Sequence, residues 1–220
     1  MSRRYTISLD LSGKLCLVVG GGQVAERKVR SLLECGAGVK VVSPGLSPGL
    51  RALAAEGRID YREGPYVTAD LDGVFLVIGA TDREEVNRRV ADDCAARNLV
   101  VNIVDDPGKG NFFVPAVVRR GDLTIAVSTG GRSPMLARKI REELERAYGP
   151  QYGDFLEILG RLREKVIENE SDENRKTEIL ERFVSEEILG LLKAGRLETV
   201  KERLESAYRG CGLEPPDGSG

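Results

Sequence analysis

Three glycines near the N-terminus stand where an apolar run gives way to a helical pattern. The run is Leu15–Val19, and Gly20, Gly21 and Gly22 follow it directly. Together with Ala25 they form G-x-G-x-x-A, which is typical of the turn between the first strand and the first helix of a dinucleotide-binding unit. In that turn the first glycine permits a tight bend, and the second lets the backbone approach a pyrophosphate. The alternative is a glycine-rich turn that binds nothing.

The helix that follows the glycines predicts how an anion would be held. A phosphate at this turn faces the unpaired N–H groups and the positive dipole end of the helix. We therefore expect Gly20, Gly22, Gln23 and Val24 to bind the pyrophosphate of a dinucleotide.

The adenosine end of the expected site departs from the usual pattern. A dinucleotide-binding unit normally carries an acid at the end of its second strand, where the acid binds the ribose hydroxyls. Here that strand, expected at 39–42, is followed by Ser43, Pro44 and Gly45. We expect backbone and loop contacts from these three residues to hold the adenosine. The missing acid leaves the choice between NAD and NADP open.

A threonine follows the fourth expected strand. Thr81 comes after the apolar run 74–78, at the carboxyl edge where open α/β sheets bind their ligands. We expect its hydroxyl to form a hydrogen bond with the cofactor. In the alternative, Thr81 or Asp82 only caps the next helix.

Asp105 is the best candidate for a general base. It follows the fifth expected strand, 99–104, at the same sheet edge as the glycine turn. The chain contains no histidine, so a carboxylate, lysine, tyrosine or thiol must move protons near neutral pH. The alternative is that Asp105 and Asp106 only form a turn before Pro107.

Basic residues gather between residues 119 and 141. They are Arg119, Arg120, Arg132, Arg138, Lys139 and Arg141. Such a cluster suits a small molecule with several negative charges, because guanidinium groups bind carboxylates through paired hydrogen bonds. The alternative is a helix surface that is charged only for solvation.

The elements that position these residues follow from the hydrophobic pattern. Strands are expected at 15–19, 39–42, 59–63, 74–78 and 99–104, and helices at 24–34, 50–56 and 82–97. This alternation predicts an α/β fold, with a Rossmann-like, mostly parallel sheet covered by helices on both faces. The predicted domain is 1–111, and it would bind NAD.

The pattern changes after residue 111. Residues 112–119 and 123–128 predict a hairpin, and Ser133 with Pro134 predicts the start of a helix. These elements form a small α+β region, 112–150, which can bury little surface unaided. We expect this region to pack on the first domain, on a second subunit, or on both. Residues 151–213 predict a helical domain with three helices, and 214–220 a disordered tail.

Composition narrows the functional classes. The chain has 220 residues and a net charge of −2, so no global charge argues for nucleic acid. No apolar run approaches the ~20 residues of a membrane helix, and the N-terminus lacks the apolar segment of a signal peptide. The four cysteines are widely separated and predict neither a metal site nor a disulfide framework. We expect a cytoplasmic protein.

In combination, these stretches resemble the precorrin-2 dehydrogenase family, which comprises the N-terminal module of siroheme synthases and their free-standing relatives. The matching blocks are 20–28, 80–82 with Asn87, 102–105, 112–116, 120–123 and 126–134. They occur in the order and spacing of the family and cover about residues 11–144. The last block is far more distinctive than the glycine turn.

The resemblance implies an activity. Members of the family pass a hydride from precorrin-2 to NAD, which gives sirohydrochlorin, and some also insert ferrous iron to make siroheme. The family's shared aspartate, proposed to move protons in both reactions, falls at Asp105. The substrate is a tetrapyrrole with many carboxylates, for which the resemblance offers Arg120, Arg132, Ser133 and Arg138 as partners.

The resemblance also implies an assembly and leaves alternatives. Family members form homodimers through the region after the nucleotide domain, with the active site between the two domains. A serine that is phosphorylated in some members falls at Thr129. The chain could be a dehydrogenase alone, or a bifunctional enzyme that also chelates iron. A third alternative is a non-catalytic, dinucleotide-sensing regulatory module. Such modules keep the acid that is missing at Ser43, and they do not explain the block 128–134.

Overall fold

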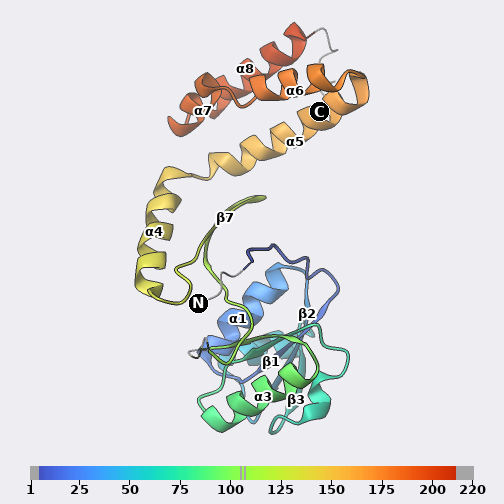
Figure 1. Ribbon diagram of the computed structural model, residues 1–220, viewed down its shortest axis with the longest axis vertical. Coiled ribbons are helices and arrows are strands. Elements are labelled where there is room, and N and C mark those ends of the chain that lie inside the picture. Colours follow the sequence, from blue (N-terminus) through green and yellow to red (C-terminus); the bar gives the residue numbers. More distant parts are fainter. Residues whose placement is uncertain (1–4, 105, 107, 212–220) are drawn as a thin grey trace. The chain divides into compact units, whose positions relative to one another are not determined.

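The computed structural model describes residues 5–104, 106 and 108–211, and the chain divides into two compact units (Figure 1). Unit 1 ends at Val114 and unit 2 begins at Pro115. The predicted tail, 214–220, and the predicted base, Asp105, lie outside the described residues.

Unit 1 is built on a parallel sheet of five strands, in the order β3-β2-β1-β4-β5. The strands are β1 (Leu15–Val19), β2 (Gly38–Ser43), β3 (Asp60–Glu63), β4 (Leu76–Gly79) and β5 (Val100–Ile103). The helices are α1 (Gln23–Glu34), α2 (Pro48–Ala55), the short 3-10 helix η1 (Thr68–Leu71) and α3 (Glu84–Ala96). This architecture confirms the predicted Rossmann-like fold, with each boundary within about two residues.

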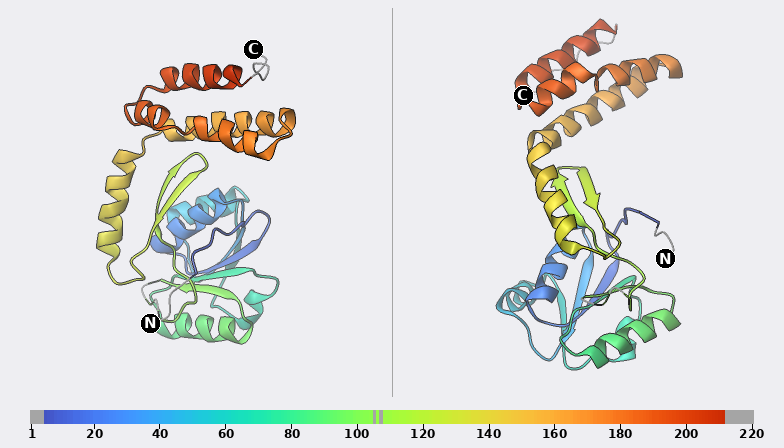
Figure 2. Two further views of the ribbon diagram at one scale, coloured as in Figure 1. Left: turned by 45° about the horizontal axis from the view of Figure 1, so that its top comes forward. Right: turned by 60° about the vertical axis from the view of Figure 1, so that its left-hand side comes forward.

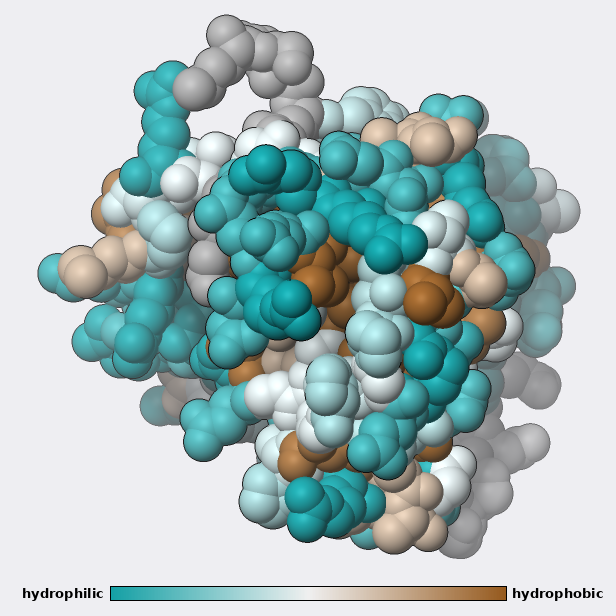
Figure 3. Space-filling view, turned by 90° about the horizontal axis from the view of Figure 1, so that it is seen from below, coloured by the Kyte–Doolittle hydropathy of each residue, from teal (hydrophilic) through white to brown (hydrophobic). Residues whose placement is uncertain are grey.

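The two faces of the sheet carry separate hydrophobic cores. Successive residues of a strand point to opposite faces, so Cys16 and Val18 of β1 pack with α1 and α2, while Leu17 and Val19 pack with α3. All four side chains are almost completely buried. Helices α1 and α3 accordingly lie on opposite sides of the sheet (Figure 2). Viewed from the α3 side, the surface is mainly hydrophilic with scattered apolar residues (Figure 3). Two filled cores hold the strand ends, and with them the loops of the site, in fixed register.

Unit 2 begins with an antiparallel hairpin and continues as helices. The hairpin pairs β6 (Ala116–Arg120) with β7 (Leu123–Val127). The helices are α4 (Pro134–Ala147), α5 (Gln151–Asn169), α6 (Glu173–Arg182), α7 (Glu186–Lys193) and α8 (Leu197–Gly210). A third core joins α5 to α8, with Phe183, Leu192 and Val200 among its buried members.

Two details of unit 2 differ from the sequence-based expectation. After residue 150 the described chain forms four helices instead of three, because α6 ends at Arg182 and α7 starts anew at Glu186. The hairpin also packs within its own unit, an arrangement that was not expected. A Cβ on Gly153 of α5 would lie 3.1 Å from the backbone of Arg120, so the hairpin turn approaches α5 closely. Leu123 packs against the third core.

No helix in the described ranges combines the length and the apolar character that crossing a membrane requires.

Candidate functional site

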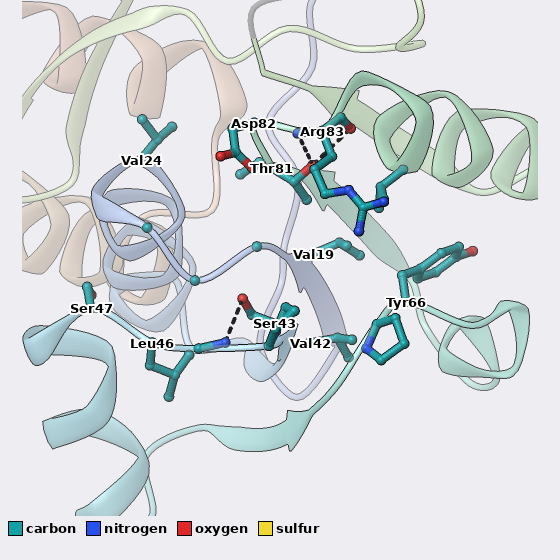
Figure 4. Close-up of a pocket in the computed structure, with 18 of the residues that line it drawn as sticks. Val19, Val24, Val42, Ser43, Leu46, Ser47, Tyr66, Thr81, Asp82 and Arg83 are labelled. Carbon is teal, nitrogen blue, oxygen red and sulfur yellow. Dashed lines mark hydrogen bonds between the residues drawn. The ribbon is translucent and has the colours of Figure 1, made fainter.

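A cavity of about 860 Å³ opens at the carboxyl ends of the central strands of unit 1 (Figure 4). This is the edge at which open α/β sheets bind their ligands, and the volume suits a cofactor-sized molecule. The cavity is lined by 19–24, 42–47, Arg51, 64–66, 80–83, Val86 and Val104. The lining therefore includes all eight residues that the sequence predicted to bind the cofactor, from Gly20 to Thr81.

The three glycines of the first turn differ in what surrounds them. Gly20 has φ +128°, and a Cβ there would overlap the carbonyl of Ala80. A Cβ on Gly21 would overlap the carbonyl of Gly45, in the loop after β2. Gly22 differs from both, because a Cβ there would meet nothing within 4 Å. The first two glycines pack the turn against neighbouring loops, and the third leaves open space beside the cavity.

The first turn of α1 offers N–H groups to that space. Gly22 is the N-cap of α1, and no side chain caps the helix. The first N–H groups of a helix have no partner within the helix. With Gln23 and Val24 in the lining, these N–H groups and the positive end of the helix dipole suit an anion such as a phosphate.

The loop after β2 forms the wall beside the glycine turn. The carbonyl oxygen of Ser43 accepts hydrogen bonds from the Tyr61 hydroxyl at 3.0 Å and from the Gly64 N–H at 3.2 Å. The Ser47 N–H donates to the Gly21 carbonyl at 2.7 Å. The backbone from Ser43 to Ser47 is thereby fixed next to the glycines.

Glu26 joins α1 to α2, a role that the sequence reasoning missed. Its carboxylate accepts hydrogen bonds from the Ser47 hydroxyl at 2.6 Å and from Arg30 at 2.7 Å, and these bonds lower the pKa of Glu26. Ser47 also caps α2 by accepting a hydrogen bond from the Leu50 N–H. An acid in the first turn of a helix, four residues after the last of the glycines, was the available signal.

Thr81 is held by a buried asparagine. The side chain of Asn87 donates to the Thr81 carbonyl at 2.9 Å, and its oxygen accepts from the Thr81 N–H at 3.4 Å. The Thr81 hydroxyl accepts from the Arg83 N–H and has Asn87 and the Arg83 carbonyl as acceptors for its own proton. The N-cap of α3 is Arg83, with no capping side chain, so neither Thr81 nor Asp82 caps this helix.

Arg83 brings a positive charge to the cavity. Its side chain points toward the space between Thr81 and Tyr66, on the side opposite Ser43 (Figure 4). Among the described residues, Asp82 is the one carboxylate in the lining.

The segment after β5 is tied to the start of α3. Val104 lines the cavity, and its N–H donates to the Gly79 carbonyl at 2.9 Å. Lys109 pairs with Asp106 at 2.7 Å and with Glu84 at 3.2 Å. Hydrogen bonding to Lys109 lowers the pKa of Asp106, whose carboxylate also accepts from the Gly108 N–H. The turn suggested for the two aspartates is therefore present at Asp106.

The predicted substrate residues lie in unit 2, and the side-chain contacts of Arg120, Ser133 and Arg138 are within that unit. The Arg120 guanidinium donates to the carbonyls of Tyr148 at 2.8 Å and Glu145 at 3.0 Å. Arg138 pairs with Glu142 at 2.8 Å. Ser133 is the N-cap of α4 and accepts a hydrogen bond from the Leu136 N–H. The described lining of the cavity belongs to unit 1, and the four predicted substrate residues belong to unit 2.

Thr129 stabilises the turn before α4. Its hydroxyl donates to the Ser133 carbonyl at 3.0 Å and accepts from the Ser133 N–H at 3.1 Å.

Both units match known protein families. Residues 7–116 match a family described as "Putative NAD(P)-binding", and residues 120–147 match "Sirohaem biosynthesis protein central". The solved structure of "SirC, precorrin-2 dehydrogenase" is 31% identical, with a TM-score of 0.78, and the match covers 94% of this chain and 100% of that one. The chain belongs to the precorrin-2 dehydrogenase family.

Siroheme synthases are also similar to this member of the precorrin-2 dehydrogenase family. That of Thioalkalivibrio sulfidiphilus is 38% identical over 98% of this chain and 44% of its own length. Siroheme synthase 1 of Aeromonas salmonicida is 41% identical over 82% of this chain and 38% of its own length. The chain thus spans less than half the length of these curated relatives.

These matches confirm the predicted family and the nicotinamide dinucleotide cofactor, and they offer no support for the sensing module.

Proposed function

We propose that the protein oxidises precorrin-2 to sirohydrochlorin, with NAD as the hydride acceptor, in siroheme biosynthesis in the cytoplasm. The observation that carries this proposal is the match to a precorrin-2 dehydrogenase over the whole of that chain, in a protein whose cavity suits a dinucleotide.

Different residues of the cavity bind different parts of the cofactor. The backbone of Gly20, Gly22, Gln23 and Val24 holds the pyrophosphate, because the first turn of α1 has no side-chain cap. The loop from Ser43 through Pro44 to Gly45 holds the adenosine. Thr81 shapes the opposite wall and can still accept a hydrogen bond there. Bound NAD supplies the hydride acceptor, and the protein supplies position and electrostatics.

The reaction removes a hydride and a proton from precorrin-2 and gives sirohydrochlorin, NADH and a proton. Asp105 accepts the proton that leaves the macrocycle. A carboxylate suits this task because the chain has no histidine.

The tetrapyrrole carboxylates are bound by the basic residues of unit 2. Arg132 and Arg138, with Ser133, bind the substrate from the turn and the first part of α4. The described bonds of Arg120 to Tyr148 and Glu145 give it an additional structural task, which is to close the end of α4 against the hairpin. A homodimer formed through 112–150 completes the substrate site.

Ferrous iron is a second substrate. The similarity to siroheme synthases over nearly all of this chain favours insertion of iron into the product. The described residues contain no cluster of three or more acidic, cysteine or histidine ligands. Carboxylates guide the iron to the macrocycle nitrogens, which bind it, and Asp105 takes up the protons that these nitrogens release as the metal enters.

A spectroscopic assay of the purified full chain tests this proposal. Precorrin-2 and NAD are mixed with the protein, the absorption spectrum is followed, and ferrous ion is then added. We expect conversion to sirohydrochlorin and then to siroheme. An unchanged spectrum in the first stage contradicts the dehydrogenase activity, and a change only in the first stage contradicts iron insertion.

The role of Asp105 is tested by a pair of adjacent variants. We expect Asp105→Ala to slow oxidation by about a hundredfold or more, as for loss of a general base. Asp106→Ala is the matched control, because the Asp106 carboxylate is already engaged by Lys109 and Gly108, and it should retain most of the rate. Equal rates for Asp105→Ala and the wild type, with unchanged NAD binding, contradict the assignment.

A further inference from the structure

The adenosine end of the cavity carries positive charge where many dinucleotide sites carry an acid. The last residue of β2 is Ser43, whose buried hydroxyl accepts a hydrogen bond from the Gly45 N–H. An acid at this position would bind the ribose hydroxyls of NAD and repel the 2′-phosphate of NADP. Since Ser43 is uncharged, it does not repel a phosphate at this position.

Arg51 of α2 supplies the charge. It lines the cavity on the same wall as Ser43, Leu46 and Ser47. Its guanidinium donates to the Leu46 carbonyl at 3.4 Å, which places it against the loop that follows β2. Within the described ranges Arg51 forms no ion pair. Most of its hydrogen-bond donors therefore stay available to a ligand.

Two acids near this wall do not oppose a phosphate in the cavity. Glu26 is engaged by Ser47 and Arg30, and Glu63 is an exposed residue at the end of β3. Neither carboxylate lines the cavity.

We infer that the site accepts the 2′-phosphate of NADP, and that Arg51 is the residue that binds it. An arginine beside the second strand is the usual partner of that phosphate, since a guanidinium forms charge-assisted hydrogen bonds with phosphate oxygens. The enzyme therefore uses NADP as well as NAD. This inference rests on the proposed function for the location of the dinucleotide.

Calorimetric titration of the full chain with NADH and with NADPH tests the inference without precorrin-2. We expect both nucleotides to bind, with dissociation constants within about tenfold of each other. Arg51→Ala should raise the ratio of the NADPH to the NADH dissociation constant by about tenfold, and Arg51→Lys should restore part of the loss. Arg58→Ala is the matched control, because Arg58 is exposed just beyond α2 and lies outside the cavity lining. Its ratio should match that of the wild type.

The outcomes separate this inference from the proposed function. Tight NADH binding with NADPH weaker by about a hundredfold or more overturns the inference alone. The inference is also overturned if Arg51→Ala leaves the ratio of the NADPH to the NADH dissociation constant unchanged from the wild type. If neither nucleotide binds, the dinucleotide site and the proposed function fail together. Thermal unfolding of each variant confirms that it is folded.

Discussion

At the scale of single residues, the walls of the cavity are held by contacts between loops, such as the close approach of Gly21 to the carbonyl of Gly45 and the hydrogen bonds from Asn87 to Thr81. Gly20 and Gly22 were expected from the motif, whereas Gly21 was not assigned a task. The need for Gly21 arises from the carbonyl of Gly45, which is distant in sequence and close only after folding. Thr81 was expected to bind cofactor, yet its position depends on Asn87, whose buried side chain holds the Thr81 backbone. Contacts of this kind leave no periodic pattern in the sequence, so they could not be predicted from it.

The glycines provide a prediction at this scale. Gly22→Val should lower the free energy of unfolding by no more than about 1 kcal/mol, because its Cβ meets nothing within 4 Å and its φ of −83° suits any residue. The remaining loss arises because glycine is favoured over valine at a helix N-cap. The same side chain occupies the space beside the first N–H groups of α1, so we expect NADH affinity to fall by at least about tenfold. Gly21→Ala is the contrasting variant and should destabilise the fold by about 2 kcal/mol or more, because its Cβ overlaps backbone. The measurements are urea denaturation and calorimetric titration. Unchanged NADH affinity in Gly22→Val contradicts the placement of the pyrophosphate.

At the scale of elements, strands and helices with a clear hydrophobic period were predicted well, and short or irregular ones less well. The five strands of unit 1 were expected near their observed ranges because they are apolar runs bounded by turns. Helix α7 was missed because eight residues carry too few turns to separate its apolar stripe from that of α6. The packing of the hairpin on α5 depends on Gly121 and Gly153, whose backbones touch across 32 residues of sequence.

An ion cluster around Asp70 of η1 links two strands to this short helix and makes the stability of the fold depend on pH. The buried Asp70 carboxylate is bound by Arg62 of β3, by Lys40 of β2 at 3.1 Å, and by the Val67 N–H at 3.0 Å. Burial alone would raise the pKa of Asp70, but these hydrogen bonds hold the pKa below its ordinary value of 3.8. The lowered pKa means that the cluster stabilises the fold above the unfolded pKa and loses this effect as the pH falls through the folded pKa.

We therefore expect Asp70→Asn to cost about 2 kcal/mol at neutral pH. This is less than for a fully buried pair, since 34% of the Arg62 side chain is exposed. The difference in unfolding free energy between the variant and the wild type should shrink as the pH falls below about 4. Urea denaturation across this pH range measures it. A difference that is constant with pH contradicts the electrostatic account.

At the scale of the whole molecule, composition and periodicity predicted the Rossmann-like domain and the helical end, and the distinctive block 126–134 indicated the family. The sequence could not show how the basic residues of unit 2 are used, because bonds such as those from Arg120 to Tyr148 and Glu145 depend on tertiary packing.

The predicted homodimer can be tested from the surface of α4. Met135 and Leu136 expose 73% and 50% of their surfaces, in the region expected to dimerise. We expect the wild type to be a dimer in light scattering after gel filtration, and Met135→Glu to be largely monomeric, because a charge buried in an interface without a partner is costly. Val184→Glu alters an exposed apolar residue outside that region and should remain a dimer. A wild-type monomer, or an unaffected Met135→Glu dimer, contradicts the assignment.

The most direct test of the central claim is the stoichiometry of the oxidation. The purified 220-residue chain is supplied with precorrin-2 and NAD without oxygen, and sirohydrochlorin and NADH are quantified together. Hydride transfer to a dinucleotide in the cavity predicts that both products form in equal amounts and that Gly22→Val slows both alike. Sirohydrochlorin that forms without NADH, or no sirohydrochlorin at all, would contradict the proposed function.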